Sequence, residues 1–395
     1  MQSKLDKYLE ILNPHGIRPT FSIPGGVLNN HSEVVEKYST KGVEFAVHGN
    51  RHIDYSGLSY HDSLRDLKEA VTRFEKNSIF SSGFRFPYLK YGNECMAALR
   101  ELPFKWDSSH TILWEVMEAG KFHPIKLKNY ENMLNQYEYS SSSSYLSLPR
   151  YDGGLLEIPV SLPDDDLLER LGLTGTNAVG EIWIRVLEHS YTRGELFNLQ
   201  LHPERIFIFK DVLASIIDRL RGLVPGIWVC QAGDIWKWWE EKRGFDVKVN
   251  CIGHGEYGVE VQCSSRGTFL VRSEVVQNNR FYGGFAIQKE RRFNLKSSKV
   301  PMIGIPKDSP PKLASFLLNE GFIFEQNEYK GQYSLYLDHF SKFSEEDELR
   351  ALKIIHESKS PLMRFWRWPD ECQSALCITG DIDALTLIDY FKNLT

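Results

Sequence analysis

Two histidines four residues apart, His48 and His52, are the first residues along this sequence that could bind a metal ion. They follow the apolar run 43–47, and Gly49 allows the backbone to turn sharply where that predicted strand ends. Functional sites in parallel α/β folds lie at the C-terminal ends of strands. Two imidazoles at this spacing can converge on one ion when the turn is tight, although such a pair taken alone more often has a structural role.

Two carboxylates near the other end of the sequence, Asp381 and Asp383, directly follow the apolar run 375–380. A spacing of two on an extended segment puts both side chains on the same face. Two buried carboxylates repel each other, and a shared metal ion would relieve that repulsion. One of them could then be a ligand while the other works as a base. A calcium loop is the alternative, but the downstream ligands that it requires are absent from the sequence.

Three further polar residues stand at or near the ends of predicted strands. Arg85 lies inside the apolar run 83–88 and needs a buried carboxylate partner, because an unpaired buried charge is very costly. Asp107 ends another predicted strand, where a lone aspartate is most often a helix cap or turn residue. His202 closes an alternating apolar run, and Pro203 prevents that strand from continuing. A structural histidine is the ordinary alternative for His202.

The elements that must position these residues alternate as in an α/β chain over residues 1–240. Strands are predicted at 18–23, 43–48, 83–88, 104–109, 155–161, 197–202 and 226–230. Helices are predicted at 5–12, 32–38, 62–74, 180–191 and 210–220. The serine-rich segment 139–145 is too polar to pack and is predicted to be an exposed loop.

The character of the sequence changes after residue 243. Residues 244–365 show strand-like alternation with one predicted helix and contain no catalytic motif, so we expect a second module that is α+β or mostly β. Residues 1–243 would form the main part of the first domain. Residues 366–395 would complete it with a buried strand at 375–383 and an amphipathic helix at 385–394.

The composition sets limits on the function. The chain has 395 residues, a formal net charge of -5 and a pI of about 6.2, which argues against binding to nucleic acid or to an anionic membrane. No apolar run approaches the roughly 20 residues that a membrane span requires. The six cysteines are scattered without any CxxC pair, and no secretory signal is visible. We therefore expect a cytoplasmic protein without a disulfide framework.

Together the five motifs resemble the polysaccharide deacetylase family, which is carbohydrate esterase family 4 with the NodB-like fold. The resemblance covers residues 1–240 and 375–394, and it implies a distorted (β/α)7-type barrel with an inserted module. It assigns the metal ligands to His48, His52 and Asp383, and the general base to Asp381. It further implies that Arg85 holds Asp381, that His202 is the general acid and that Asp107 orients His202. The backbone N–H of Tyr88 would stabilise the oxyanion. Leu199 and Leu201 would shape an acyl pocket, and Trp106 would also contact the substrate.

The same resemblance implies metal-dependent hydrolysis of an N-acetyl group on a sugar. Two histidines and a carboxylate suit zinc best, with cobalt, nickel or iron as alternatives. The segment 155–166 resembles one in relatives attached to surface-polysaccharide synthesis, so an N-acetylated precursor is the expected partner. A small ureide or cyclic-amide hydrolase of the same fold is one alternative. A catalytically inactive carbohydrate-binding protein is the other.

The position of the aspartate motif departs from the family. Family members carry it before the first helix, whereas here it stands at 381–383, and Ile382 separates the two aspartates. A circular permutation would explain this order, because the C-terminal strand would then insert as the first strand of the barrel beside 18–23. The alternatives are that the chain is a fragment or that the strand is donated to a neighbouring subunit, which would make the protein a homo-oligomer.

Overall fold

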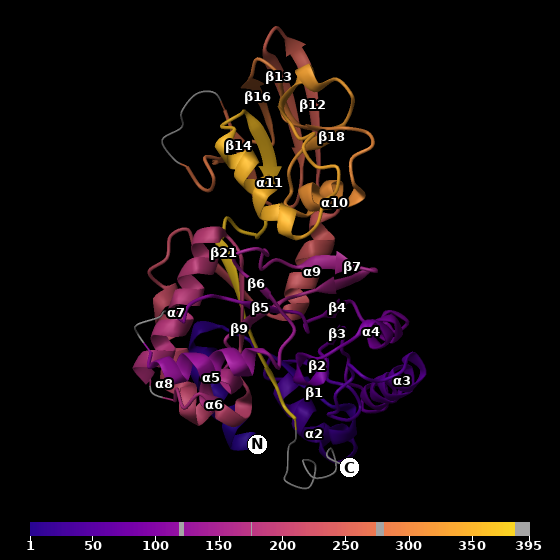
Figure 1. Cartoon of the computed structure of the whole chain (residues 1–395), viewed down its shortest axis with the longest axis vertical. Helices are drawn as coiled ribbons and strands as arrows, with labels where there is room; N and C mark the ends of the chain where they lie inside the picture. Colours follow the sequence, from indigo (N-terminus) through magenta and orange to yellow (C-terminus); the bar gives the residue numbers. More distant parts are fainter. Residues whose placement is uncertain (118–121, 175, 274–279, 384–395) are drawn as a thin grey trace. The chain divides into compact units, whose positions relative to one another are not determined.

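The computed structural model describes residues 1–117, 122–174, 176–273 and 280–383, and it shows two compact units (Figure 1). The barrel unit contains residues 1–143, 147–237 and the chain from 375 onward. The inserted unit contains residues 144–146 and 238–374. The chain thus enters the inserted unit after Lys237 and leaves it after Ser374, near the expected boundaries at 243 and 365.

One large sheet organises the barrel unit. Among the described residues it has 12 strands in the order β6-β5-β9-β10-β21-β1-β2-β3-β4-β8-β7, with β11 also paired to β21. The strands are β1 (Thr20–Ile23), β2 (Glu44–Val47), β3 (Gly83–Phe84), β4 (Trp106–Asp107), β5 (Thr111–Leu113), β6 (Tyr139–Ser141), β7 (Arg150–Asp152), β8 (Leu155–Glu157), β9 (Val160–Leu162), β10 (Leu196–Gln200), β11 (Ile227–Cys230) and β21 (Ser374–Asp381). Neighbours from β6 to β8 pair in parallel, and β7 pairs antiparallel to β8. The predicted fold class, an α/β barrel of distorted (β/α)7 type, is confirmed in the form of an α/β half-barrel with mostly parallel strands.

The C-terminal strand β21 lies in the middle of this sheet, between β1 and β10 of the same chain (Figure 1, yellow). Its register pairs Phe21 with Gly380 on one side and Asn198 with Cys377 on the other. All eight of its residues are buried, as expected of a strand with neighbours on both edges. The prediction that the C-terminus supplies a strand beside β1 is therefore confirmed. This strand order is the one that a circular permutation would produce.

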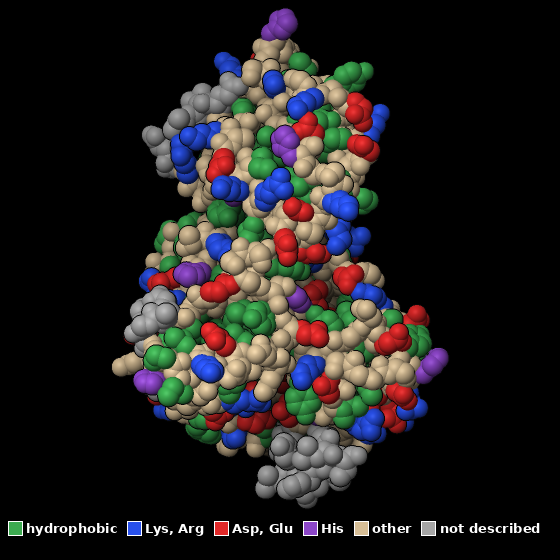
Figure 2. Space-filling view, viewed as in Figure 1, with side chains coloured by type: hydrophobic (Ala, Val, Ile, Leu, Met, Phe, Trp, Pro, Cys, Tyr) green, Lys and Arg blue, Asp and Glu red, His purple; other side chains and the backbone are tan. Residues whose placement is uncertain are grey.

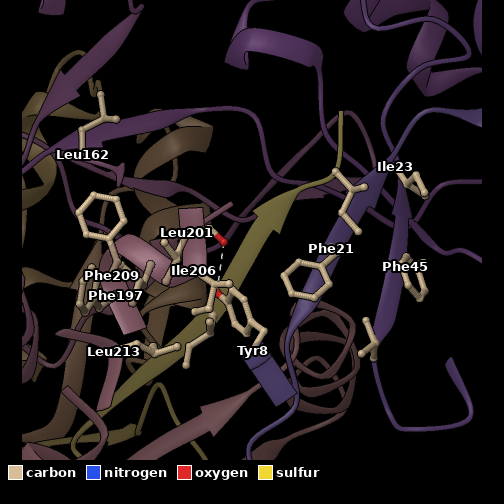
Figure 3. Close-up of a cluster of buried hydrophobic side chains, with 14 of the residues drawn as sticks. Tyr8, Phe21, Ile23, Phe45, Leu162, Phe197, Leu201, Ile206, Phe209 and Leu213 are labelled. Carbon is tan, nitrogen blue, oxygen red and sulfur yellow. Dashed lines mark hydrogen bonds between the residues drawn. The ribbon is translucent and has the colours of Figure 1, made fainter. Parts of the chain in front are cut away.

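Amphipathic helices cover the sheet. They are α1 (Gln2–Leu12), α2 (Leu28–Ser39), α3 (Tyr60–Lys76), α4 (Asn93–Arg100), α5 (Pro124–Leu134), α6 (Asp165–Arg170), α7 (Thr176–Arg193) and α8 (Ile206–Leu220). The next helix, α9 (Ala232–Lys242), begins in the barrel unit and ends in the inserted unit. Helix α1 buries the stripe Leu5, Tyr8, Leu9 and Leu12, which recurs with the period of a helix. Its Tyr8 hydroxyl donates a buried hydrogen bond to the Leu201 carbonyl at 3.2 Å, which ties α1 to the end of β10 (Figure 3). The predicted helix at 385–394 lies outside the described residues.

Two local predictions are wrong. The segment 139–145 is not simply an exposed loop, because β6 pairs in parallel with β5 and the carboxylate of Glu115 accepts hydrogen bonds from the Ser141 and Ser142 hydroxyls. These partners satisfy the polar groups that suggested a solvated loop. The single strand predicted at 155–161 is divided into β8 and β9 around Pro159, which has no N–H to donate to a neighbouring strand.

The inserted unit is an α+β module. Its strands are β12 (Asp246–Gly253), β13 (Glu256–Gln262), β14 (Phe269–Arg272), β15 (Ala286–Gln288), β16 (Arg292–Lys296), β17 (Val300–Ile305), β18 (Phe324–Gln326), β19 (Tyr333–Tyr336) and β20 (Leu362–Phe365), and its helices are α10 (Pro311–Asn319) and α11 (Glu346–Glu357). They form three three-stranded sheets. A fully buried ionic triad joins α10 to β20: the Glu320 carboxylate accepts from the guanidiniums of Arg364 at 3.0 Å and Arg367 at 2.7 Å.

The distribution of charged and apolar residues has two features that bear on function. On the face drawn in Figure 2, acidic and basic side chains are interspersed. Over the described residues, no helix has both the length and the apolar character needed to cross a membrane.

Candidate active site

Three predicted metal ligands, His48, His52 and Asp383, come together at the C-terminal ends of β2 and β21. Asp383 Oδ1 is 3.1 Å from His52 Nε2 and 4.0 Å from His48 Nε2. One ligand atom of each residue lies within 4.8 Å of the others. The strands converge here because both run parallel to β1, which lies between them. The sequence prediction that these distant residues share one site agrees with this geometry.

The turn between the two histidines depends on Gly49. Its φ of 72° is in the left-handed region that glycine adopts without strain. A side chain at this position would also place its Cβ 2.5 Å from the Tyr55 hydroxyl, which is too close. Gly49 thus allows His48 and His52 to point at the same place, and their rings lie 5.1 Å apart.

The surroundings of His48 keep its imidazole neutral, which is the form that binds a metal ion. Its Nδ1 lies 2.8 Å from the Arg85 carbonyl, which can only accept, so the proton is on Nδ1 and the lone pair is on Nε2. Within the described part of the chain, Nε2 is buried and has no hydrogen-bond partner. Burial lowers the pKa of His48 to about 4, although the nearby Asp381 carboxylate favours the cation. A buried lone pair of this kind fits a divalent ion.

Asp383 supplies the negative charge of the same group. Burial favours its neutral form, but the hydrogen bond from His52 and the positive charge of His202 outweigh burial and lower the pKa of Asp383 below its usual range. Its carboxylate therefore stays ionised at neutral pH. Two imidazole nitrogens and one carboxylate oxygen form a donor set that suits zinc and leaves coordination positions open.

Asp381, the predicted base, is held at both oxygens. Arg85 Nη1 donates to Oδ1 at 3.0 Å, and Gln200 Nε2 donates to Oδ2 at 3.0 Å. Oδ2 also lies 3.9 Å from the Nε2 atoms of both His48 and His202. Burial opposes ionisation, but the Arg85 charge outweighs it and lowers the pKa of Asp381. The predicted pairing of Arg85 with Asp381 is present.

A polar network inside the sheet satisfies Arg85, which is 1% exposed. Its Nε donates to the Ser108 carbonyl at 2.7 Å, and its Nη2 donates to the hydroxyls of Ser108 and Thr379 at 3.0 Å each. The Thr379 hydroxyl donates in turn to Asn198 Oδ1 at 2.9 Å. Because each partner is fixed by another, the network holds the guanidinium rigidly against Asp381.

His202 pairs with a different aspartate from the one predicted. Its Nδ1 lies 2.7 Å from Asp165 Oδ1, and its backbone N–H donates to Asp165 Oδ2 at 2.8 Å. Burial alone would favour the neutral imidazole, but the Asp165 carboxylate outweighs it and raises the pKa of His202 well above its usual value. His202 is therefore a cation that can act as an acid.

Asp107, which we expected to orient His202, lies elsewhere. Its Oδ1 accepts from the Ser109 hydroxyl at 2.7 Å, and the Glu157 carboxyl lies beside it. Burial, together with the negative charge of Asp107, raises the pKa of Glu157 well above its usual value, so this pair carries a proton at neutral pH. The expectation for Asp107 is wrong because β9 ends nearer to β10 than β4 does, and Asp165 follows β9.

The predicted substrate-binding residues point away from this site. Side chains alternate along β10, so Asn198, Gln200 and His202 face the polar network, whereas Leu199 and Leu201 face the helices. Figure 3 shows Leu201 among buried apolar side chains near Tyr8 and Ile206. An acyl pocket built from these two leucines is therefore wrong.

Trp106, the third predicted substrate residue, is also buried. It is 1% exposed, and its ring lies over Gly83 so closely that a Cβ there would be 1.9 Å from Trp106 Cζ2. The glycine makes room for the indole between β3 and β4. Trp106 thus packs within the fold instead of meeting a substrate.

Tyr88 lies at the edge of the metal group. Its backbone φ of 60° is unusual for a residue with a side chain, and such strain is found most often at functional sites. Its ring is 49% exposed and contacts the His52 ring edge-on at 4.4 Å between centroids. Its position is compatible with the predicted oxyanion role of its amide.

Two important residues were not expected. Asp165 follows β9 at the sheet edge where the other polar residues gather, a signal that the Asp-Asp-Asp run 164–166 offered. Gln200 stands two residues before His202, so strand alternation alone places both on one face. The alternation is visible in the sequence, but the family resemblance assigns the functional role to Leu199 and Leu201 instead.

A protein family and several solved structures are similar to parts of the chain. Residues 2–106, which contain His48, His52 and Arg85, match the polysaccharide deacetylase family model. Three solved structures resemble the chain, each covering 60% of it: a protein of Mycobacterium smegmatis assigned to the polysaccharide deacetylases (19% identity, 76% of that chain, TM-score 0.43), Puue allantoinase (16%, 72%, 0.47) and a protein of Pseudomonas aeruginosa PAO1 with the same assignment (17%, 72%, 0.47). No curated protein matches the sequence. Residues 2–106 are thus similar to the polysaccharide deacetylase family, as the motifs around His48, His52 and Arg85 predicted.

Proposed function

We propose that this protein hydrolyses the N-acetyl group of an acetylated sugar with the help of a divalent metal ion. The observation that carries the proposal is the position of Asp381. Its Oδ2 lies 3.9 Å from His48 on the metal side and 3.9 Å from His202 on the other. A base thus stands between a group that can bind an electrophilic metal and a cationic acid, as amide hydrolysis requires.

The ion would be held by His48, His52 and Asp383. Zinc is the ion that this donor set suits best. When bound, such an ion polarises the acyl carbonyl and lowers the pKa of water. The buried, unpartnered Nε2 of His48 supports this assignment.

The residues of the chain would carry the protons. Asp381 accepts a proton from the water that attacks the acyl carbon, while Arg85 and Gln200 hold its two oxygens in place. The Tyr88 amide would donate to the developing oxyanion. His202, kept cationic by Asp165, then gives its proton to the sugar nitrogen as the C–N bond breaks. Acetate and a free amine leave.

The natural substrate that we propose is an N-acetylated precursor of a surface polysaccharide. The support is the segment 155–166, which resembles that of relatives in this process and here supplies Asp165, the partner of His202. The zinc-loaded protein should be tested on N-acetylglucosamine oligosaccharides and, in parallel, on a small cyclic amide. It should release acetate from the oligosaccharides and should not hydrolyse the cyclic amide.

Asp381→Asn should keep the metal but lower turnover by about 10²–10⁴-fold, because an amide cannot accept the proton. His48→Ala should lose the metal itself. Acetate release and elemental analysis measure the two effects. Asp211→Asn, a change at an exposed residue on α8, is the matched control. Parental turnover in the Asp381 variant would contradict the role given to this residue.

A further inference from the structure

A groove runs along one side of α3, beside the beginning of α2 and the turn at residues 50 and 51. Two adjoining cavities of about 680 and 480 Å³ form it, and they share Asn29, Arg65, Glu69 and Arg73 in their lining. The turn at its end is the one that carries the metal ligands His48 and His52. None of the residues given a catalytic role above lines it.

The groove is basic although the whole chain has a net charge of -5. Five cationic side chains line it: Arg51, Arg65, Lys68, Arg73 and Lys76. Four of them, Arg65, Lys68, Arg73 and Lys76, lie on α3 and line the same cavity.

The acidic residues of the groove are already engaged at its end. Asp66 accepts from Arg51 Nε at 3.0 Å and from the Asn50 backbone at 2.9 Å. Glu69 accepts from the Asn50 side chain at 2.7 Å. Over residues 1–117, 122–174, 176–273 and 280–383, neither Lys68, Arg73 nor Lys76 has a carboxylate within 4.0 Å. These three cations thus form no ion pair within the described residues, although the Glu69 carboxylate lines the same groove.

This arrangement is unfavourable for the helix by itself. Arg65 and Lys68 are three residues apart, as are Arg73 and Lys76, and like charges at this spacing repel on a helix surface. Asp62, which pairs with Arg65 at 2.6 Å, and Glu69, which is four residues from both Arg65 and Arg73, offset only part of this repulsion. A bound anion would remove the repulsion.

We propose that the groove along α3 binds a phosphate group, as a phosphate ester or a diphosphate. The planar guanidiniums of Arg65 and Arg73 match phosphate oxygens, and Lys68 and Lys76 add positive charge. The side-chain amides of Asn29 and Asn30 can hydrogen-bond the hydroxyls of an attached sugar. The phosphate could belong to the substrate, an assignment that rests on the proposed function, or it could be a free anion. The binding chemistry is the same for both sources.

Calorimetry with inorganic phosphate and with a nucleoside diphosphate N-acetylhexosamine tests the groove on the full-length, zinc-loaded chain. Lys68→Gln/Arg73→Gln should weaken binding of both probes by about tenfold or more, since two charge-assisted contacts are lost. Higher salt should weaken binding to the wild type. Lys210→Gln/Arg221→Gln removes the same charge from the exposed surface of α8 and its end, and it should bind like the wild type.

Lys68→Glu provides a second variant, which should weaken binding as well because it introduces a repelling charge. The substituted side chains lie on the surface, so the melting temperatures should match the wild type. Equal affinity of the wild type and the groove variants for both probes, including no measurable binding to any, would overturn the proposal.

Acetate release then separates the two sources of phosphate. If the phosphate belongs to the substrate, the groove variant should raise KM for the nucleoside diphosphate sugar and leave KM for an uncharged N-acetyl oligosaccharide unchanged. If it is a free anion, calorimetry should show the loss while both KM values stay the same. If neither sugar releases acetate, the proposed function fails, but the calorimetric result still decides the groove.

Discussion

At the scale of single residues, the candidate site gives opposite charge states to two histidines. Burial keeps His48 neutral, with a pKa of about 4, and the Arg85 carbonyl fixes its proton on Nδ1. His202 is buried as well, but the Asp165 carboxylate at 2.7 Å raises its pKa well above the usual value. A neutral imidazole suits a metal ligand, and a cationic one suits an acid. The environment thus decides which histidine has which role.

Asp165→Asn should lower the pKa of His202, because burial remains while the stabilising anion is lost. The activity should then fall by about 10²-fold near neutral pH, and the alkaline limb of kcat/KM should move to lower pH, since the acid loses its proton earlier. Asp166→Asn changes a neighbour that contacts Arg205, not His202, and is the matched control. A pH profile of acetate release measures the shift. Unchanged limbs in both variants would show that Asp165 does not control the acid.

Sequence reasoning at this scale found the residues of the metal group and the pairing of Arg85 with Asp381, but not the partner of His202. His48, His52 and Asp383 stand in short motifs at the ends of predicted strands, where the resemblance offers no other candidate for a metal ligand. The partner of His202 could not be chosen by spacing, because Asp107 and Asp165 both follow predicted strands. Only the order of strands in the sheet decides between them, and that order depends on contacts far apart in the sequence.

At the scale of elements, the structure depends on β21. This strand pairs with β1 and β10 and brings Asp381 and Asp383 to the histidines. Its apolar run and terminal carboxylates made it predictable from the sequence. The short strand β6 was not predictable, because its serines depend on Glu115, which is 26 residues away from Ser141. Polar segments can be ordered when a distant partner satisfies them.

A chain that ends after Gln373 should lose metal binding and the folded barrel unit. Without β21 the edges of β1 and β10 are left unpaired in the middle of the sheet, and buried apolar side chains such as Leu376 and Ile378 are lost. Elemental analysis and thermal melting check this result. Adding a peptide of residues 374–395 in excess should restore part of the metal binding. A truncated chain that binds zinc and melts like the full one would contradict the central place of β21.

At the scale of the whole molecule, each unit has its own buried charged group. In the barrel unit, the Arg85 network serves the candidate site. In the inserted unit, Glu320 joins Arg364 and Arg367 and no catalytic motif is nearby. Burial opposes the Glu320 anion, but the two guanidiniums outweigh it and lower its pKa to about 2. The three charges thus satisfy one another inside the inserted unit.

Glu320→Gln should destabilise the inserted unit by about 3–5 kcal/mol, because two buried guanidiniums lose their counter-charge. A carboxyl group whose pKa is lowered on folding stabilises the folded state above its unfolded pKa. The wild type should therefore lose this stabilisation as the pH falls from about 4.5 to about 2, and the variant should not show that loss. Denaturant titrations at several pH values measure both effects. Glu345→Gln, which pairs with Lys312 at the surface, is the control and should change stability little.

The position of β21 also determines when the barrel sheet can be completed during synthesis of the chain. A ribosome completes β1 and β10 before it begins the inserted unit, and it makes the strand that belongs between them only after residue 374. At about 5–20 residues per second, the growing barrel waits on the order of ten seconds with a gap at its centre. During that interval, the inserted unit can fold first, while the two strands flanking the gap need protection from other chains. The nascent protein carries both histidines of the metal group for the whole of this time, and neither aspartate, so the candidate site can be completed only after residue 383 has been made.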